Sequence, residues 1–492
     1  MIALLLVLLP LITGVATFFL RKENAAKKLA LLSSLATMVI SILGLTLFNK
    51  TELLQFSADW LPGLGTKFDI RLDGMGQLLC LLTAISFPLI FISTWQRTYK
   101  NAHNFFALML LAQAGLMGVF LAMDALVFYF FWELALIPVY FLCSMWGGEK
   151  RIAATFKFFI YTFAGSVLML VALIYLQTQT VDHSFSINSF YQLEIKNDIQ
   201  NWLFVLMFIA FAIKMPLFPF HTWQPDLYEQ SPTSTTMVLS GIMVKMGLFG
   251  VIRWLLPTLP SASFAYGETT VAVLAVIGML YASLLAMRQN DMKRLIAYSS
   301  IAHIGLMVIA IFAETQLAMQ GVMIQLFSHG INIIGLWIIV EWIERKYGTT
   351  KFSELGGLAQ KAPVMSILFV VIALANISLP LTNGFVGEFL MFSGIFTSKI
   401  FTYQIVITAA AGVCIILSAV YMLRMVQKII YGNTSAITAN ATDIGFNEKF
   451  ALSIIALLIL AVGLFPQPIL DLTQTTATQI LNEANILHLL KK

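Results

Sequence analysis

The sequence is poor in charged residues. Only 11% of its 492 residues are Asp, Glu, Lys or Arg, whereas soluble proteins carry about 25%. Hydrophobic residues make up 59% of the chain, and the mean hydropathy is +0.87. These values exclude an ordinary soluble protein and indicate that the lipid bilayer is the solvent of this chain.

Cysteine is scarce as well. Cys80, Cys143 and Cys414 lie in apolar segments without the spacing of metal ligands, so they predict no disulfide, zinc site or iron–sulfur cluster. The sequence has no glycine-rich phosphate loop and no histidine spacing suited to haem, and we expect no cofactor in this chain. The net charge of +5 is spread over short loops, which argues against nucleic-acid binding.

Long apolar runs are abundant. They are too long and too continuous for barrel strands, which alternate over short segments. They predict an all-α polytopic membrane protein with fourteen transmembrane helices, at residues 2–20, 29–48, 75–95, 104–123, 125–147, 152–177, 202–225, 232–256, 270–288, 295–313, 316–343, 363–396, 402–430 and 449–470. The first run has no preceding positive charge, which favours a spanning helix over a cleaved signal peptide. Residues 1–492 are predicted to form a single membrane domain.

Basic residues gather at the ends of alternate runs. They are Arg21/Lys22, Arg97/Lys100, Lys150/Arg151, Arg288/Lys293/Arg294, Arg345/Lys346/Lys351 and Arg424/Lys428. Because cytoplasmic loops are enriched in Lys and Arg, these ends are predicted to face the cytoplasm. The longer loops 49–74 and 178–200 then face outward, the first with a short strand or hairpin around Lys67 to Leu72. Both termini are expected on the periplasmic side of a bacterial inner (plasma) membrane.

Two runs contain helix-breaking residues. The breakers are Pro216 and Pro219 in the seventh run and Asn376, Pro380, Asn383 and Gly384 in the twelfth. A break frees backbone carbonyls that water or neighbours must satisfy, and transporters build mid-membrane sites in this way. The broken helices are five helices apart and so run in opposite directions. This offset predicts two inverted five-helix repeats, residues 104–256 (helices four to eight) and residues 270–430 (helices nine to thirteen).

Titratable residues occur deep inside several runs. They are Glu133, Lys214, Lys245, His303, His329 and Glu388. A charge at the centre of a bilayer costs at least ~2.5 kcal/mol, so two lysines in adjacent helices need a compensating reason. Proton or ion handling is such a reason. The order of the six residues along successive helices predicts one hydrated chain of proton carriers through the middle of the protein.

Lys214 is the expected partner of Glu133, because a buried carboxylate needs a nearby cation. Separating the two would favour proton release from Lys214, and their approach would oppose it. Lys245 would receive or pass on that proton. His303 and His329 are of the residue type that titrates near physiological pH, and they bridge the gap toward Glu388 beyond the second break.

Simpler explanations exist for each of these residues. The lysines could extend to the lipid headgroups, the histidines could be hydrogen-bonded packing residues, and Glu388 could lie near the membrane surface. His221, beside the first break, could contact water or a loop. We interpret Arg97, Asp124 and Asp226 as charges at helix ends.

Four long segments carry a family resemblance. They read FYFFWELALIPVYFL, AIKMPLFPFHTWQPD, SPTSTTMVLSGIMVKMG and RLIAYSSIAHIGLM. They resemble the antiporter-like membrane subunits of proton-pumping NADH:quinone oxidoreductase, respiratory complex I, and the likeness covers all fourteen runs. The resemblance implies two inverted repeats, broken seventh and twelfth helices and a proton channel that uses Glu133, Lys214 and Lys245. It also implies that flavin, iron–sulfur clusters and quinone are bound by partner chains.

Glu388 makes the chain most similar to the subunit M type of that family, the counterpart of mitochondrial subunit 4. The matching residue is a lysine in the L-type and N-type subunits, which are the partners that the resemblance implies. One departure is Leu381, because a glycine is expected after Pro380. The large subunit of a multi-subunit sodium/proton antiporter looks similar and stays an alternative, as does a structural scaffold without an ion path.

Overall fold

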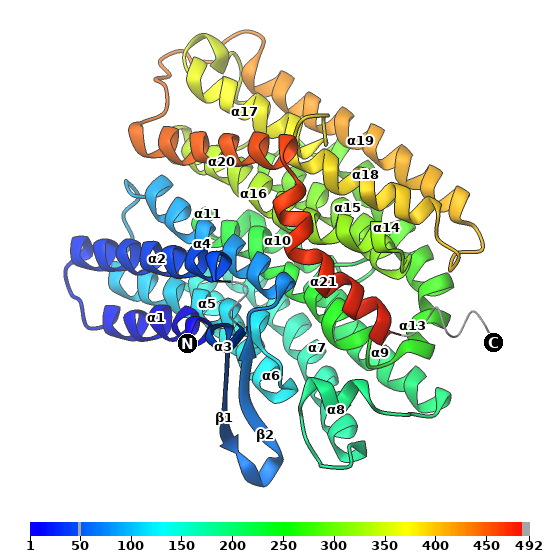
Figure 1. Cartoon of the computed structure of the whole chain (residues 1–492). Coiled ribbons are helices and arrows are strands. Elements are labelled where there is room, and N and C mark those ends of the chain that lie inside the picture. The colour runs from blue at the N-terminus through cyan, green and yellow to red at the C-terminus, as the bar shows by residue number, and fades with distance from the viewer. Residues whose placement is uncertain (48–50, 485–492) are drawn as a thin grey trace.

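The computed structural model describes residues 1–47 and 51–484, and this part of the chain is mostly helical (Figure 1). The end of the predicted second run at residue 48 and the start of the predicted loop at residues 49 and 50 lie outside the described residues. By length and composition, eleven of the described helices could each cross a membrane. Ile2–Thr17 and Pro363–Asn376 are shorter apolar helices.

The N-terminal part contains ten helices and a hairpin. The helices are α1 (Ile2–Thr17), α2 (Glu23–Thr46), α3 (Thr51–Leu54), α4 (Gly74–Ser93), α5 (Ala102–Leu121), α6 (Ala125–Trp146), α7 (Arg151–Gln179), α8 (Ile187–Tyr191), α9 (Asn197–Lys214) and α10 (Trp223–Gln230). The predicted break in the seventh run is confirmed, because α9 ends at Lys214 and α10 begins at Trp223.

Two of the following spans are composite helices. The first consists of α11 (Thr233–Val238), the π-helical turn η2 (Leu239–Met243), α12 (Lys245–Gly250) and a second π-helical turn, η3 (Val251–Leu255). The second consists of α13 (Pro260–Tyr266), the π-helical turn η4 (Gly267–Val271) and α14 (Ala272–Arg288). Each composite counts as one apolar span.

The C-terminal part contains seven more helices. They are α15 (Met292–Phe312), α16 (Gln316–Tyr347), α17 (Pro363–Asn376), α18 (Asn383–Phe396), α19 (Gln404–Ile430), α20 (Phe446–Leu464) and α21 (Gln467–Glu483). The break in the twelfth run is confirmed by the gap between α17 and α18. The predicted last run was too long, because Pro466 ends it and α21 starts a separate helix.

A β-hairpin projects from the helices, as the sequence predicts (Figure 1). Its strands β1 (Gln55–Leu61) and β2 (Thr66–Arg71) are antiparallel and joined by the 3-10 turn η1 (Pro62–Leu64). The carboxylate of Asp124 holds the turn end of the hairpin by accepting hydrogen bonds from Thr66 Oγ1 (2.8 Å) and from the amide of Lys67 (3.2 Å). The same carboxylate caps α6, which agrees with its interpretation as a helix-end charge.

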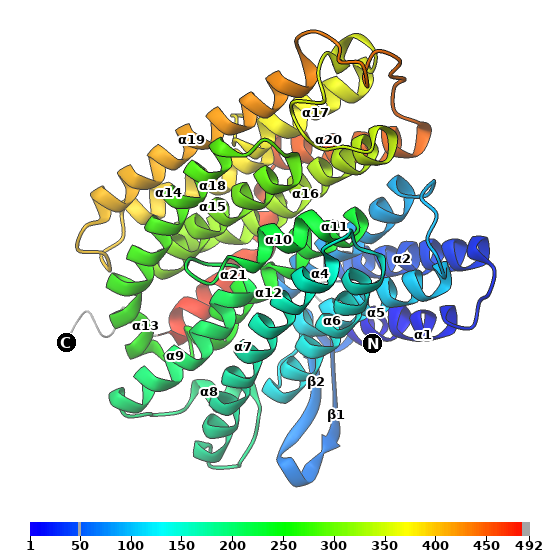
Figure 2. The same cartoon turned by 180° about the vertical axis from the view of Figure 1, so that it is seen from behind.

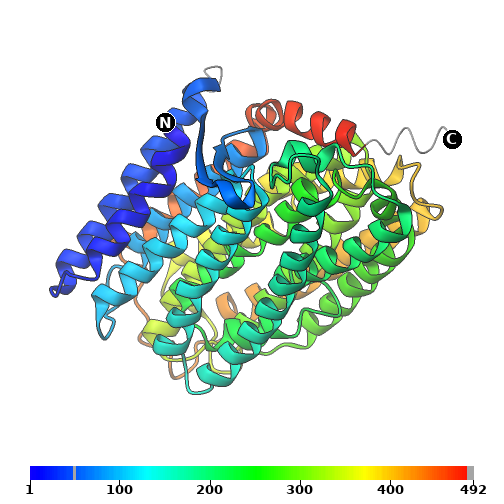
Figure 3. The same ribbon diagram turned by 90° about the horizontal axis from the view of Figure 1, so that it is seen from below.

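The two faces of the helical layer differ. Figure 3 shows the hairpin, α21 and the N-terminus along one face. On the other face, Lys27 donates to the carbonyls of Trp95 (3.1 Å) and Arg97 (2.9 Å), and Arg97 pairs with Glu341 at 2.9 Å. These contacts bring helix ends that are rich in basic residues to a common side, in agreement with the predicted alternation.

The centre of the protein is α16. It packs against α4, α11, α15, α17, α18 and α20, and its apolar stretch is entirely buried by protein. By contrast, only 28% of the apolar stretch of α19 is buried. A helix that is apolar all round and fully enclosed can carry polar residues only where other helices satisfy them, so His329 of α16 must find partners inside the protein.

The broken end of α9 lies directly on α12 (Figure 2). This contact depends on Gly247, where a Cβ atom would lie 2.7 Å from the carbonyl oxygen of Phe211 and 2.8 Å from the amide nitrogen of Met215. One turn further, a Cβ atom at Gly250 would lie 2.4 Å from the ring of Phe211. The two glycines therefore let the backbones of the helices that carry Lys214 and Lys245 approach each other.

We expect Gly247→Ala to destabilise the protein by about 1–3 kcal/mol, because the added methyl group overpacks a backbone contact. Thermal unfolding of the purified protein in detergent measures this change. Gly412→Ala in α19 is the matched control, because a Cβ atom there meets nothing within 4 Å. Equal unfolding temperatures for the two variants would contradict the close approach of α9 and α12.

Candidate functional site

The first break leaves its carbonyls satisfied by protein groups. The amide of Met215 donates to Phe211 O, and the amide of Leu217 donates to Ala212 O, both at 2.8 Å. The indole Nε1 of Trp223, the first residue of α10, donates to Ile213 O at 3.0 Å. The end of α9 is thereby closed at the position of Lys214, and α10 restarts beside it (Figure 2).

Lys214 is buried, with 1% of its surface exposed. Its Nζ has no hydrogen-bond partner among the residues described and lies 5.3 Å from the ring centre of Trp132 and 5.9 Å from that of Phe158. Aromatic faces attract cations. Oε1 of Glu133, the residue next to Trp132, is also buried without a partner. The direct contact expected between Glu133 and Lys214 is therefore not formed, and the ammonium group faces two aromatic rings instead.

Lys245 has two partners. Its Nζ donates to Ser240 O at 2.9 Å and lies 3.0 Å from Nδ1 of His329. In a regular α-helix, Ser240 O would accept from the amide of Val244. In the π-helical turn η2, that amide bonds to Leu239 O instead, at 3.2 Å. The wide turn thus leaves the Ser240 carbonyl available to Lys245, and π-turns are frequent at functional sites for such reasons.

The line of titratable groups continues through two histidines. Nε2 of His329 lies 3.4 Å from Oγ of Ser300, and the ring of His329 lies 5.6 Å from that of His303. His303 in turn places Nδ1 3.2 Å from Oε1 of Glu388. The structure therefore brings Lys245, His329, His303 and Glu388 together in that order.

A small cavity adjoins the end of this line. Its volume is about 20 Å³, and its lining includes His303, Glu388 and Tyr421. A cavity needs roughly 10–15 Å³ to hold one water molecule. The hydroxyl of Tyr421 donates to Oγ of Ser299 at 3.0 Å, so polar groups of α15, α18 and α19 converge where a water could bridge them.

The second break positions Glu388 and contains the departure noted in the sequence. Leu381 has a φ of 76°, in the left-handed region that favours glycine. This is the position at which the family pattern leads us to expect a glycine. Side chains stabilise the ends of the break: Asn332 donates to Ala375 O at 3.2 Å, and Asn376 donates to Oγ of Ser299 at 3.3 Å.

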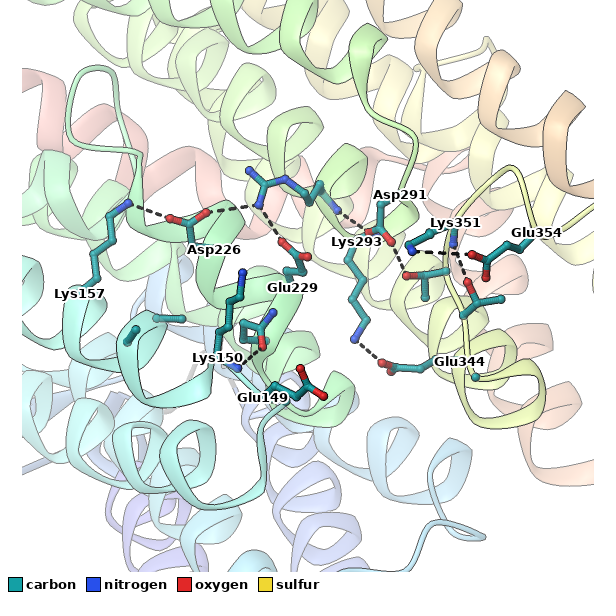
Figure 4. Close-up of a pocket in the computed structure, with 18 residues that line it drawn as sticks. Glu149, Lys150, Lys157, Asp226, Glu229, Asp291, Lys293, Glu344, Lys351 and Glu354 are labelled. Atoms are coloured by element: carbon teal, nitrogen blue, oxygen red, sulfur yellow. Dashed lines mark hydrogen bonds and ion pairs between the residues drawn. The ribbon is translucent and has the colours of Figure 1, made fainter.

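A large charged hollow lies next to α10, on the face that carries the basic helix ends (Figure 4). Its volume is about 810 Å³. Five ion pairs join residues of its lining: Lys157–Asp226 (2.8 Å), Arg294–Glu229 (2.7 Å), Arg294–Asp226 (3.3 Å), Lys293–Glu344 (2.6 Å) and Lys351–Glu354 (3.7 Å). Asp226, interpreted as a helix-end charge, lies in the first turn of α10. The hollow adjoins the helix that follows the first break.

The sequence signature described as "NADH:quinone oxidoreductase/Mrp antiporter, TM" matches residues 122–415, more than half of the chain. The chain belongs to this family. It is 36% identical to F(420)H(2) dehydrogenase subunit M of Methanosarcina mazei across 98% of both chains. It is 37% identical to NADH-quinone oxidoreductase subunit M of Rickettsia prowazekii across 96% of this chain and 97% of the relative.

Two solved structures have the same fold as this chain. A chain of respiratory complex I from Thermus thermophilus superposes with a TM-score of 0.89 at 28% identity, over 98% of this chain and 100% of that one. A chain of the Mrp complex from Dietzia gives a TM-score of 0.87 at 18% identity, over 99% and 98% of the two chains. At that identity, the Mrp match shows the shared fold alone.

Sequence reasoning missed a buried cation in this family member. Arg253 is 4% exposed, and its guanidinium pairs with Asp73, the N-cap residue of α4. Its carbonyl accepts a 2.7 Å hydrogen bond from Tyr191. The signal that identified Lys214 and Lys245, a charge inside an apolar run, applies equally to Arg253. The hydrogen bond from Lys245 to Ser240 could not be found in this way, because the acceptor is the backbone carbonyl of Ser240 and not its side chain.

A second missed group is Glu314, in the turn between α15 and α16 and outside both helices. Its φ is 52°, and both of its carboxylate oxygens are buried without a hydrogen-bond partner in the described chain. Burial raises the pKa of Glu314 to about 8 from its ordinary value of 4.5. The folded state therefore favours the protonated carboxyl group.

We expect Leu381→Gly to leave the protein as stable or to stabilise it by up to about 1 kcal/mol. Relief of left-handed strain, about 1–2 kcal/mol, offsets the added flexibility of glycine, about 0.5–1 kcal/mol. Leu379→Gly is the control, since Leu379 is also exposed but has no left-handed backbone, and we expect it to destabilise the protein. Thermal unfolding of both variants tests the difference, and the opposite order would contradict it.

We expect Glu314→Gln to stabilise the protein in a pH-dependent way. Above the ordinary pKa near 4.5, unfolding lets Glu314 ionise, so its burial weakens the native state increasingly up to the folded pKa of about 8. Gln lacks this cost. The unfolding temperature should rise by at least about 2 °C at pH 8, which corresponds to ~1 kcal/mol, and stay unchanged near pH 4. Exposed Glu149 provides the control, Glu149→Gln, and a pH-independent effect at Glu314 would refute the explanation.

Proposed function

We propose that this chain is a proton-translocating membrane subunit of a complex I-type quinone oxidoreductase, of the subunit M type. The observation that carries the proposal is the line from Lys245 through His329 and His303 to Glu388, which consists of hydrogen-bonding or neighbouring titratable groups buried in the protein. Such groups are costly inside a membrane and are kept where they move protons or ions.

The chemistry of the line favours protons over sodium. A lysine ammonium has three donors and no acceptor, so it cannot coordinate a metal cation. When Lys245 is an ammonium it can only donate, so Nδ1 of His329 accepts, and its Nε2 then carries the hydrogen that faces Ser300. A proton passed from Lys245 to Nδ1 is matched by release of the proton on Nε2. Ser300 or a water would relay it to His303 and then to Glu388.

Uptake in this proposal begins at the charged hollow beside α10. Its lining carries both carboxylates and cations on the face of the basic helix ends, which we take as cytoplasmic. A proton would reach Lys214 and pass to Lys245 when water bridges the two. Within the described residues, Nζ of Lys214 and Oε1 of Glu133 have no hydrogen-bond partner, which agrees with a pair whose distance changes during turnover, through movements of neighbouring subunits.

We propose fourteen crossings for the chain. The eleven spans in the described residues are completed by α1, by α9 with α10 and by α17 with α18. The two broken helices then belong to inverted repeats at residues 104–256 and 270–430. Both termini lie on the periplasmic side of the plasma membrane, and L-type and N-type chains are the neighbours.

Proton transfer by a subunit of this type does not depend on which electron donor the assembly uses. Relatives at similar identity are named as subunits of an F(420)H(2) dehydrogenase and of NADH-quinone oxidoreductases. Subunits of one type therefore occur with different donors. We infer that donor and quinone bind to other chains, which also hold the flavin and iron–sulfur clusters, and that this chain contributes the proton path.

We expect Glu133→Ala and Lys214→Ala to assemble but to lower proton pumping and the coupled NADH oxidation roughly tenfold or more, because each removes a group that transfers or controls the proton. The assay is quenching of a pH-sensitive dye by membrane vesicles, with subunit content checked by native gels. Exposed Glu194 and Lys196 provide the controls Glu194→Ala and Lys196→Ala. Full activity of assembled Lys214→Ala would refute the proton path.

The sodium/proton antiporter is the second candidate, favoured by the fold shared with the Mrp complex. What co-purifies with the chain decides between the two. Flavin and iron–sulfur subunits identify an oxidoreductase, whereas several small membrane chains without redox subunits identify an antiporter. In a scaffold without an ion path, neutralising the buried charges would leave transport unchanged.

A further inference from the structure

A second pocket, unrelated to the proton line, lies at the basic end of α19. Its volume is about 250 Å³, and its lining residues are Asn290, Phe352, Ser353, Arg424 and Lys428. One water occupies only about 30 Å³ in the liquid, so the pocket can hold a much larger group. The lining includes two cations, one helical turn apart, and no carboxylate.

Two carboxylates that adjoin lining residues in the sequence, Asp291 and Glu354, have partners outside the pocket lining. Asp291 accepts hydrogen bonds from the amides of Lys293 and Arg294 and from the hydroxyl of Thr350, so it caps α15. Glu354 lies 3.7 Å from Lys351. The positive charge of the pocket is therefore left for a ligand from outside the chain.

Other contacts fix the pocket in shape. The amide of Phe352 donates to Asn290 O at 2.9 Å, and the amide of Met292 donates to Thr350 O at 3.0 Å. Arg424 donates to the carbonyl of Met287 and, at 3.2 Å, to Oδ1 of Asn290. Arg424 is thus held against the end of α14, whereas Lys428 is exposed and can reach an incoming group.

An apolar stripe runs along α19 away from the pocket. It consists of Val413, Ile416, Val420 and Leu423, which are 46–66% exposed. The spacing of three and four residues places them on one side of the helix. The adjacent helix α14 also exposes Ile277 (44%) and Leu284 (54%). A cationic pocket is therefore followed by an apolar surface that continues toward the centre of the membrane.

We propose that this pocket binds the phosphate headgroup of an anionic phospholipid, with the acyl chains lying along the exposed stripe of α19. A phospholipid combines one anion with long apolar chains, which matches the two parts of the surface. Cationic pockets between helices at the cytoplasmic side of a membrane suit lipid headgroups of this charge. A soluble anion would use the cations only and leave the stripe unoccupied.

The test uses the intact assembly in membrane vesicles that contain a photoactivatable phospholipid, with the labelled residues mapped by mass spectrometry. We expect phosphatidylglycerol to label residues 413–423 more than phosphatidylcholine with the same acyl chains. Lys428→Gln should reduce this labelling about fivefold, the factor that corresponds to ~1 kcal/mol for one basic residue near the surface. Lys449→Gln is the matched control, since Lys449 is an exposed lysine near the start of α20 and lines none of this pocket.

Four results would overturn the proposal. Equal labelling by the two lipids, or labelling that Lys428→Gln leaves unchanged, would show that the pocket does not select an anionic headgroup. Calorimetric binding of inorganic phosphate that depends on Lys428, without lipid selectivity, would identify a free-phosphate site. Loss of a neighbouring subunit from Lys428→Gln, with lipid labelling retained, would identify a subunit interface.

Discussion

The structure depends on how positive charge is solvated inside an apolar protein. An ammonium group taken from water must find acceptors or an aromatic face, because the surrounding helices offer few polar groups. Lys245 has a carbonyl oxygen at 2.9 Å and an imidazole nitrogen at 3.0 Å, whereas Lys214 faces the rings of Trp132 and Phe158. Two cations 3.0 Å apart would repel strongly, so Lys245 and His329 can share only one positive charge at a time.

Irregular backbone accompanies the charged groups. α9 stops at Lys214, the π-helical turn η2 precedes Lys245, and a break separates α17 from Glu388 of α18. Each irregularity takes backbone groups out of the helical ladder, which is tolerated at membrane depth only when protein or water satisfies them. Packing compensates for the disruption. Enclosed α16 carries His329 and packs against α15 and α18, which carry His303 and Glu388, and Gly247 lets α12 lie against the closed end of α9.

Much of the fold could be predicted because its signals are local. Apolar runs located the helices, and Pro216 and Pro380 marked the breaks. The predicted end of the last transmembrane helix was wrong, because the sequence stays apolar on both sides of Pro466, where the helix ends. Helix α21 was not predicted, because it is amphipathic and contains no long apolar run. The direct contact predicted between Glu133 and Lys214 is not formed, because the position of the ammonium group depends on three-dimensional packing against Trp132, which no spacing along the chain encodes. The φ of Leu381 shows the reverse case, where an unusual residue identified a strained position.

The proposed proton path is connected between Lys245 and Glu388 but interrupted between Lys214 and Lys245. This difference bears on how proton transfer is coupled to quinone reduction. From Lys245 to Glu388, each titratable side chain is hydrogen-bonded to the next or, between the two histidines, has its ring centre 5.6 Å from that of the next, so in the proposed mechanism a proton needs only small rearrangements or one bridging water to move along them. Between Lys214 and Lys245, the described residues provide no such contact for the Lys214 ammonium. A pump must never offer a continuous path to both sides of the membrane, since protons would then flow back. An interruption at Lys214 meets that requirement, and in the proposed mechanism the aromatic rings around it form the gate, because water must displace them before a proton can pass.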